Sequence, residues 1–455
     1  MNTTRGKARI LGAGLAGSEA AWQLAQRNIE VTLYEMRPHQ TTKAHKTSLC
    51  AELVCSNSFR GAGLENAVGL LKEELALWNS LIMEAAKACE VPAGGALAVD
   101  RERFSRYVDD KIHSHPLITV VREEIVEIPE TSAQDPVIVA TGPLTSQPLA
   151  RAIEQFTGHG NLAFYDAISP IIFRESINAE KVFRQSRYDK GGDDYLNIPL
   201  EREAYYTFVE QVLAAEKYTG NIAVEQEQLG DLRPFEGCMP IEDMAERGPD
   251  TLLFGPLKPV GLTDPRTGKR PYAVIQLRQD DLEGELWSMV GLQTRMKRAD
   301  QQRIFTSLPG LELAEFVRYG SVHRNTFIDS PQCLDATLAF RGRPGLFFAG
   351  QITGVEGYVE STAGGLAAAL NVYRLLSNAP LIEFPRETAL GALLGYISET
   401  GRKDFQPMNI SFGLMPSYLE LPNRNGRQKI PKKERRLSAS NRALAATAAL
   451  IRTVV

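Results

Sequence analysis

Two of the five cysteines stand in polar, turn-forming stretches that could give a thiol a chemical task. Cys55 lies in CAELVCSNSFRG and is followed by serine, asparagine and, five residues on, Arg60. Cys238 lies in RPFEGCMPIE, where a proline on each side would fix the turn. An arginine held close to a thiol lowers its pKa and favours the thiolate, which is the nucleophile. Cys55 and Cys238 are therefore candidate nucleophiles, and burial as small apolar side chains is the alternative for each.

Two further side chains could handle protons or contact a ligand. Glu236 precedes Cys238 by two residues; its charge would disfavour a thiolate, yet it could serve as a general base. His323 lies among polar turn residues in YGSVHRNTFIDSP, and a packing histidine is the alternative there. The other cysteines have no polar frame, their total is odd and no CxxC pair occurs, so we expect a reducing compartment and no metal site. The cysteines expected to be structural are Cys50, Cys89 and Cys333.

The N-terminus predicts the element that would hold a nucleotide beside these groups. Residues 8–17, ARILGAGLAG, read as a short strand that ends in a glycine turn, and SEAAWQLAQR continues as a helix. IEVTLYE then alternates as a second strand and ends at Glu35, the spacing expected for an acid that binds a ribose hydroxyl. In such a unit the glycines allow the turn, the approach of a pyrophosphate and close helix packing. The residues that this unit brings to a dinucleotide are Gly12, Ala13, Gly14, Leu15, Ala16, Gly17 and Glu35, with Arg37 just beyond.

Two later glycine turns indicate which dinucleotide is bound. DPVIVATGP predicts a strand that ends at Gly142, and PGLFFAGQITGVEGYVESTAGGLAAALN predicts a strand, a loop and a small-residue helix. A helix start after such a loop can present backbone N–H groups to a second part of a cofactor. Segments this far apart in the chain favour FAD over NAD, although plain tight turns of an α/β sheet are the alternative. The candidate contacts in the late loop are Gly350, Gln351, Gly354, Gly357, Tyr358 and Ser361.

The composition changes between these two halves. Alternating segments such as DAISPIIF and YLNIPL, with turn prolines, and the amphipathic stretch EREAYYTFVEQVLAAEKY indicate an inserted α+β unit. We therefore expect an α/β chain with a doubly wound, three-layer, Rossmann-like FAD-binding domain. That domain would be discontinuous, formed by residues 1–150 and 321–455. Residues 151–320 would form the inserted α+β domain and contribute to the substrate site.

The charge distribution bears on partners and location. The net charge of −4 argues against a protein that coats nucleic acid non-specifically. A basic stretch near the C-terminus is nevertheless a candidate phosphate-binding surface, with a solvated loop as the alternative. No apolar run is long enough to span a membrane and the N-terminus lacks a continuous apolar core, so a cytoplasmic location is expected. The basic residues proposed for RNA are Arg424, Arg427, Lys429, Lys432 and Lys433.

Taken together, several unusual blocks resemble the bacterial folate- and FAD-dependent tRNA uracil-5-methyltransferases. The blocks are GAGLAGSEAAWQLA, LYEMRP, ELVCSNSFRG, NAVGLLKEE, PFEGCMPIE, GPLKPVGL, AVIQLRQDD, HRNTFI and FAGQITGVEGYVES, spread from residue 7 to about residue 420. The resemblance implies methylation of C5 of the T-loop uridine of tRNA. The one-carbon unit would come from 5,10-methylenetetrahydrofolate, and the reducing equivalents would come from NADH or NADPH through FAD.

The resemblance also implies roles for individual residues. Cys238 matches the family's nucleophile toward uracil, and Cys55 matches its second essential cysteine, beside the flavin. His323, with its neighbours Arg324 and Asn325, matches the segment that contacts the folate. The N-terminal glycines and Glu35 would hold the adenosine half of FAD, and the late loop would hold the flavin half.

Three alternatives are weighed against this interpretation. The same chemistry could act on a ribosomal-RNA uridine. The chain could belong to the larger FAD-dependent enzymes that modify wobble uridines of tRNA, which share the N-terminal fingerprint. A non-enzymatic FAD- or RNA-binding module is the third alternative, and bleaching of bound flavin by NAD(P)H would argue against it.

Overall fold

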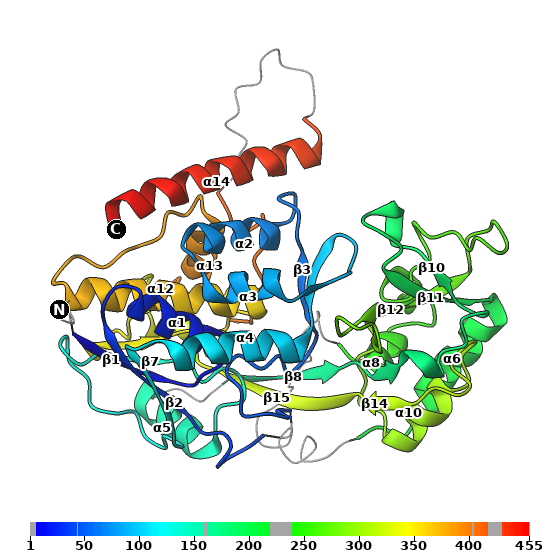
Figure 1. Ribbon diagram of the computed structural model, residues 1–455, viewed down its shortest axis with the longest axis horizontal. Helices are drawn as coiled ribbons and strands as arrows, with labels where there is room; N and C mark the ends of the chain where they lie inside the picture. Colours follow the sequence, from blue (N-terminus) through cyan, green and yellow to red (C-terminus); the bar gives the residue numbers. More distant parts are fainter. Residues whose placement is uncertain are drawn as a thin grey trace.

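The computed structural model describes residues 6–42, 44–158, 162–218, 239–402, 405–416 and 430–454. Figure 1 shows two parts side by side, with the chain ends in the left-hand part and the green segments of mid-chain in the right-hand part. The side chains of residues 162–165 and 323–324 lie outside the described part.

A parallel sheet organises the part that holds both chain ends. Its strand order is β16-β7-β1-β2-β6, and every neighbouring pair is parallel. The first strand pairs on both sides, so the N-terminal segment lies in the middle of the sheet. Buried strands of this kind need helical connections, and the chain supplies them as the sequence predicts. The strands are β1 (Lys7–Leu11), β2 (Glu30–Glu35), β6 (Ile118–Arg122), β7 (Val137–Val139) and β16 (Leu346–Phe348).

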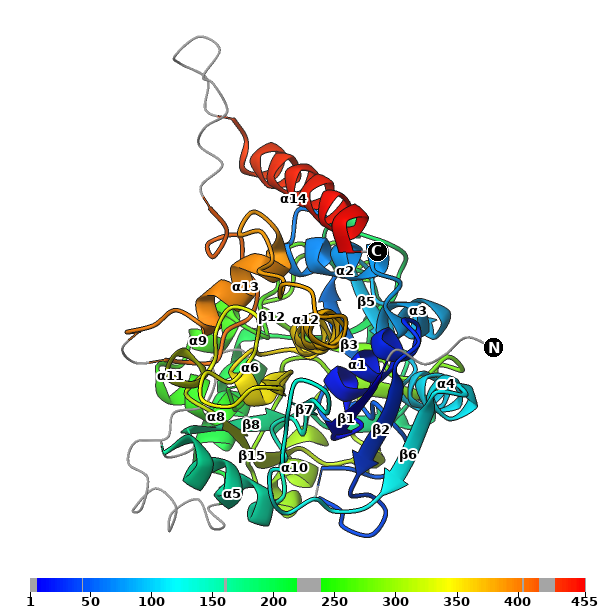
Figure 2. The same cartoon turned by 90° about the vertical axis from the view of Figure 1, so that its left-hand side faces the viewer.

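Helices from both ends of the chain pack around this sheet. Helix α1 lies against α12 (Figure 2), so the first helix and a late helix meet although more than 330 residues separate them in the sequence. A small antiparallel sheet of order β3-β5-β4 joins the same part. The elements are α1 (Leu15–Ala25), β3 (Ser58–Gly61), α2 (Ala67–Leu77), α3 (Leu81–Ala88), β4 (Glu90–Val91), β5 (Ala96–Val99), α4 (Arg101–Ser114), α5 (Gln147–Thr157), α11 (Ser330–Cys333), α12 (Tyr358–Leu376) and α13 (Ala389–Ile397).

The mid-chain part is built on an antiparallel sheet of order β10-β11-β12-β13-β9-β14. The predicted amphipathic helix is present as α6 (Arg202–Ala214), and its buried face belongs to the core over this sheet. The other elements are β9 (Ile171–Phe173), β10 (Phe183–Arg184), β11 (Tyr195–Leu200), α8 (Ile241–Glu246), α9 (Thr251–Phe254), β12 (Ala273–Gln279), β13 (Leu286–Met289), α10 (Arg298–Phe305) and β14 (Phe316–Arg318).

Each part has its own hydrophobic core, and an antiparallel pair of strands connects the two parts. Buried apolar residues of the first core come from Ala8 to Ile153 and from Phe327 to Val454, and those of the second from Ile172 to Ala314. The chain leaves the first part through β8 (Leu162–Ile168) and returns through β15 (Ser321–Phe327), which pair along their full length. The predicted architecture, a Rossmann-like α/β domain with an inserted α+β unit, is confirmed. The proposed division at residues 150 and 321 stays a prediction.

The C-terminal helix α14 (Lys432–Val454) packs across the outside of α2, above the first part in Figure 1. Ser440 Oγ donates a hydrogen bond to Leu64 O at 2.8 Å, and Arg436 donates to Glu65 O at 3.2 Å. In the described part of the chain, every helix falls short of the length and apolarity that a membrane span needs.

A buried carboxylate ties α2 to the start of α13. Glu74 accepts hydrogen bonds from the backbone N–H groups of Ala389 at 2.7 Å and Leu390 at 3.0 Å. Burial raises the pKa of Glu74 to about 7. Glu74→Ala should therefore lower the free energy of unfolding by about 2 kcal/mol, because two buried donors lose their acceptor. Thermal unfolding measures the loss of stability. Glu73→Ala, at the exposed neighbouring position, is the control. Equal melting temperatures for the two variants would contradict a stabilising role for the Glu74 carboxylate.

Candidate active site

A first cavity opens at the carboxyl ends of β1, β2 and β7, where ligands bind in parallel α/β sheets. Its walls include Gly12 and Gly14 from the turn after β1, Glu35 and Arg37 from the end of β2, and Thr141 from the end of β7. Ser146, before α5, lines the same cavity, and its Oγ is buried with no hydrogen-bond partner among the described residues. Gly12, Gly14, Glu35 and Arg37, predicted from the sequence as cofactor contacts, thus line one cavity.

The three glycines of the turn have different surroundings. Gly12 has φ +97°, and a Cβ there would lie 2.7 Å from Ala140 O, so the turn against β7 needs glycine. A Cβ on Gly17 would lie 1.8 Å from Gly12 O, which is far inside contact distance. A Cβ on Gly14, in contrast, would have no atom within 4 Å. Gly12 and Gly17 are thus needed by the fold itself, whereas Gly14 borders open space in the cavity.

Glu35 is held in its ionised form at the rim of this cavity. It accepts hydrogen bonds from Ala13 N at 3.0 Å, Arg37 N at 3.0 Å and Arg37 Nε at 2.8 Å. Burial opposes ionisation of Glu35, but the hydrogen bonds and charge of Arg37 outweigh it, so the pKa of Glu35 is lowered. Ala13 therefore contributes its backbone to the position of Glu35.

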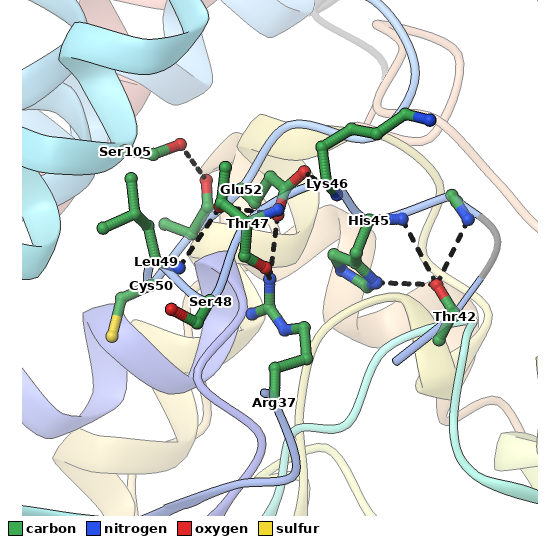
Figure 3. A network of polar contacts seen from close by, with 12 residues as sticks. Arg37, Thr42, His45, Lys46, Thr47, Ser48, Leu49, Cys50, Glu52 and Ser105 are labelled. Atoms are coloured by element: carbon green, nitrogen blue, oxygen red, sulfur yellow. Dashed lines mark hydrogen bonds and ion pairs between the residues drawn. The ribbon is translucent and has the colours of Figure 1, made fainter. Parts of the chain in front are cut away.

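Arg37 was predicted to contact the cofactor, and its guanidinium is engaged mainly with protein groups (Figure 3). It also donates to Glu52 Oε2 at 3.0 Å and to Thr47 O at 3.2 Å. Glu52 in turn accepts from the backbone N–H groups of Lys46 at 2.6 Å and Thr47 at 3.0 Å. This network fixes the loop after β2 against the first cavity.

The same loop brings His45 into the wall of the first cavity. Its Nδ1 lies 2.8 Å from Thr42 Oγ1 (Figure 3). Burial and the positive charge of Arg37 lower the pKa of His45 to about 4. His45 is therefore a neutral ring at physiological pH, and sequence spacing gave no signal for it.

A second cavity of about 380 Å³ lies where the two parts of the molecule meet. Cys55, Ser56 and Arg60 form one wall, and Gln351 and residues 356–359 form another. Ser288 to Gly291, together with Gln293, belong to the second part. The structure thus brings Cys55, Asn325, Gln351, Gly357 and Tyr358, all predicted as site residues, into one cavity.

The backbone around Cys55 is fixed by groups distant in the sequence. Cys55 N–H donates to Tyr358 Oη at 3.0 Å, and Arg101 donates to Cys55 O at 2.8 Å. Arg318 donates to Val54 O at 2.7 Å. Arg60, the nearby cation in the sequence, instead forms an ion pair with buried Glu360. The cations beside Cys55 are therefore Arg101 and Arg318, which sequence reasoning missed.

Arg278 of β12 links the inserted part to the cysteine segment. Its Nε donates to Asn57 Oδ1 at 3.0 Å and its Nη2 donates to Ser56 Oγ at 2.8 Å. Because Arg278 is buried, its pKa is lowered. Ser56 and Asn57 therefore connect the segment after Cys55 to β12 of the mid-chain part.

The remaining predicted residues fall into three groups. Gly142 follows β7, while Gly350, Gly354 and Ser361 lie in the turn after β16 and the first turn of α12. Leu15 and Ala16 begin α1, and Ala16 lies against Gly350. Lys432 and Lys433 are exposed in the first turn of α14. Those outside the described residues are Cys238, Glu236, Arg424, Arg427 and Lys429; for His323 and Arg324 the backbone lies in β15 but the side chains are outside the described part.

The cysteines expected to be structural are buried. Cys50 and Cys333 are 0% and 4% exposed. Burial raises the pKa of Cys333 to about 11, and it also raises the pKa values of Cys50 and Cys89. All three are therefore protonated at neutral pH.

Comparison with known proteins agrees with this architecture. The family model "Glucose inhibited division protein A" matches residues 7–380. GidA from Aquifex aeolicus superposes with a TM-score of 0.72 at 16% identity, over 98% of this chain and 73% of that chain. The fold and the first cavity therefore place the chain in the GidA class of dinucleotide-binding proteins.

Relatives with higher sequence identity show the family within this class to which the chain belongs. A protein of Symbiobacterium thermophilum is 56% identical over 97% of this chain and 96% of its own length, and one of Listeria monocytogenes is 55% identical over 95% and 98%. Both are named methylenetetrahydrofolate--tRNA-(uracil-5-)-methyltransferase TrmFO. The chain belongs to this TrmFO family.

Proposed function

We propose that this protein methylates C5 of the T-loop uridine of tRNA, with 5,10-methylenetetrahydrofolate as the one-carbon donor. The observation that carries the proposal is the 56% identity with the Symbiobacterium enzyme over 97% of the chain. The second cavity supports it, because that cavity joins Cys55 to both halves of the molecule.

The residues of the first cavity fit the adenosine and pyrophosphate end of FAD. Space beside Gly14 and the start of α1 suit a pyrophosphate, and the ionised Glu35 suits a ribose hydroxyl. We place the flavin end against Gly350, Gln351 and the start of α12, which open toward the second cavity. When bound, FAD supplies the reducing equivalents from NADH or NADPH that the methyl group requires.

Two cysteines share the covalent chemistry. Uracil C5 is a poor nucleophile, so a thiolate must first add to C6, and we assign this role to Cys238. Ile241, three residues later, donates to Gln293 O at 2.8 Å, and Gln293 lines the second cavity. Cys238 itself lies outside the described residues. Cys55 acts as the second thiol, and the positive charges of Arg101 and Arg318 favour its thiolate.

The folate is assigned to the same cavity, at β15. Asn325 is buried there, and its Oδ1 has no hydrogen-bond partner within the described part of the chain. The Oδ1 atom of Asn325 could therefore accept a hydrogen bond from a donor on the substrate, such as an amine or amide of the pterin ring. His323 and Arg324 would complete this contact.

The wider features of the proposal follow from the RNA substrate. Lys432 and Lys433, with the basic residues before them, would contact tRNA phosphates, and a tRNA-modifying enzyme would act in the cytoplasm. We assign residues 1–150 and 321–455 to FAD binding, and residues 151–320 contribute to the folate and tRNA site.

Transfer of label from [methylene-¹⁴C]tetrahydrofolate into RNA tests the function. The purified protein with NADH or NADPH should label a tRNA transcript at the T-loop uridine, mapped by nuclease digestion, and should leave a ribosomal-RNA fragment unlabelled. Label in the ribosomal fragment alone would move the function to that RNA. Failure to label either RNA, with flavin present and reducible, would overturn the methyltransferase proposal.

A further inference from the structure

Glu356 is a buried acid in the wall of the second cavity. It lies in the turn just before α12 and is 7% exposed. Its N–H donates to Met408 O at 2.9 Å, and its own carbonyl accepts from Asn409 Nδ2 at 2.6 Å. Because both backbone groups are bonded to one segment, the position of this residue is fixed.

Gln351 orients the side chain of Glu356, because Gln351 Nε2 donates a hydrogen bond to Glu356 Oε2 at 2.5 Å. Gln351 and Asn409 line the same cavity. The carboxyl group is therefore held at the wall that Cys55 and Tyr358 also form.

The electrostatic surroundings favour the protonated form of this carboxyl group. Burial, followed by the nearby Asp166 of β8 and by Cys55, raises the pKa of Glu356 well above its ordinary value. Glu360 of α12 acts in the same direction, and the hydrogen bond from Gln351 opposes the shift. Asp166 itself accepts from Asn325 Nδ2 at 3.0 Å and lines the cavity. The second cavity therefore favours the protonated form of Glu356.

We propose that Glu356 is the proton donor and acceptor for the one-carbon transfer, placed by Gln351 and Asn409 in the cavity shared with Cys55. The inference rests on the proposed function. It gives the reaction an acid that is present in the described cavity, whereas Glu236, the general base suggested by the sequence, lies outside the described residues.

Two proton transfers need such a group. Opening the five-membered ring of methylenetetrahydrofolate breaks the bond between the methylene carbon and N10; the electron pair goes to N10, which takes the proton of Glu356. The methylene carbon stays on N5 as an iminium ion and is attacked by uracil C5. The Glu356 carboxylate then removes the original proton from C5, and the C5–H electron pair moves into the C4 carbonyl as an enolate. The carboxyl group ends as it began.

Glu356→Gln tests this assignment in the full-length protein with FAD bound. Methyl transfer to tRNA should fall about 100-fold or more, and release of tritium from [5-³H]uridine tRNA should fall with it. FAD absorption should be unchanged, as should the covalent adduct with 5-fluorouridine tRNA formed without folate, because thiolate addition to C6 does not need this acid. Glu356→Asp should restore part of the activity, and Glu383→Gln, at an exposed position, should match the wild type.

The outcomes separate this inference from the proposed function. A wild-type protein that transfers no methyl group would overturn the function, and with it the inference. A wild-type protein that methylates tRNA beside a Glu356→Gln variant that releases tritium at the wild-type rate would overturn the inference alone.

If Glu356→Gln loses FAD, the pH dependence of the single-turnover rate tests the role of Glu356 instead. The wild-type single-turnover rate should fall at alkaline pH as Glu356 loses its proton, and Glu356→Asp should shift that decline. A decline that Glu356→Asp leaves in place would exclude Glu356 as the donor.

Discussion

Cys238→Ala is expected to abolish both the covalent adduct with 5-fluorouridine tRNA and methyl transfer, with a loss of roughly 10³-fold or more. The thiolate is the only group in this proposal that activates uracil C5, so no other side chain can replace it. FAD should remain bound, because none of the assigned FAD contacts lies near Cys238 in the sequence. The adduct is measured as a slower band on a denaturing gel.

Cys55→Ala is the matched variant, and it should separate the roles of the two thiols. It should keep the adduct with 5-fluorouridine tRNA but lose methyl transfer. Its backbone contacts to Tyr358 and Arg101 use main-chain atoms of residue 55, so the loop should keep its position. An adduct that persists in Cys238→Ala and disappears in Cys55→Ala would reverse the two assignments.

Gly14→Val is expected to give a folded protein that has lost FAD. A Cβ at Gly14 would have no atom within 4 Å, so the valine side chain should extend into the space that we assign to the pyrophosphate. The variant should be colourless after purification, with affinity for FAD reduced by about 100-fold or more. Its melting temperature should equal that of wild-type protein stripped of FAD.

Gly17→Val is the control for this variant, because the fold needs that glycine. Its side chain would collide with Gly12 O, and a loss of about 4 kcal/mol or more should leave little soluble protein. A Gly14→Val protein that binds FAD as tightly as the wild type would contradict the placement of the cofactor.

The N-terminal unit could be predicted because its signals are local. Strand, turn, helix and strand follow one another within residues 7–35, and Gly12, Gly17 and Glu35 are where the pattern put them. The antiparallel insertion was predictable for the same reason, since alternation and turn prolines are read within a few residues.

The surroundings of Cys55 could not be predicted in this way. Arg101, Arg278 and Arg318 reach residues 54–57 from positions 46 to 264 residues away. Arg60, close in the sequence, was the natural candidate, but its guanidinium pairs with the buried acid Glu360. Arg37 shows the same limit, since the acid Glu52 that binds it lies in a loop without regular structure.

The most direct test of the central claim follows the hydrogen atoms of the new methyl group. The protein, NADH or NADPH, unmodified tRNA and methylenetetrahydrofolate with two deuterium atoms on the methylene carbon are incubated, and the nucleosides are analysed by mass spectrometry. We predict 5-methyluridine at the T-loop position with a CHD₂ methyl group, because carbon and two hydrogens come from folate and the third from the reductant. An unlabelled methyl group, or modification that needs S-adenosylmethionine, would contradict the account.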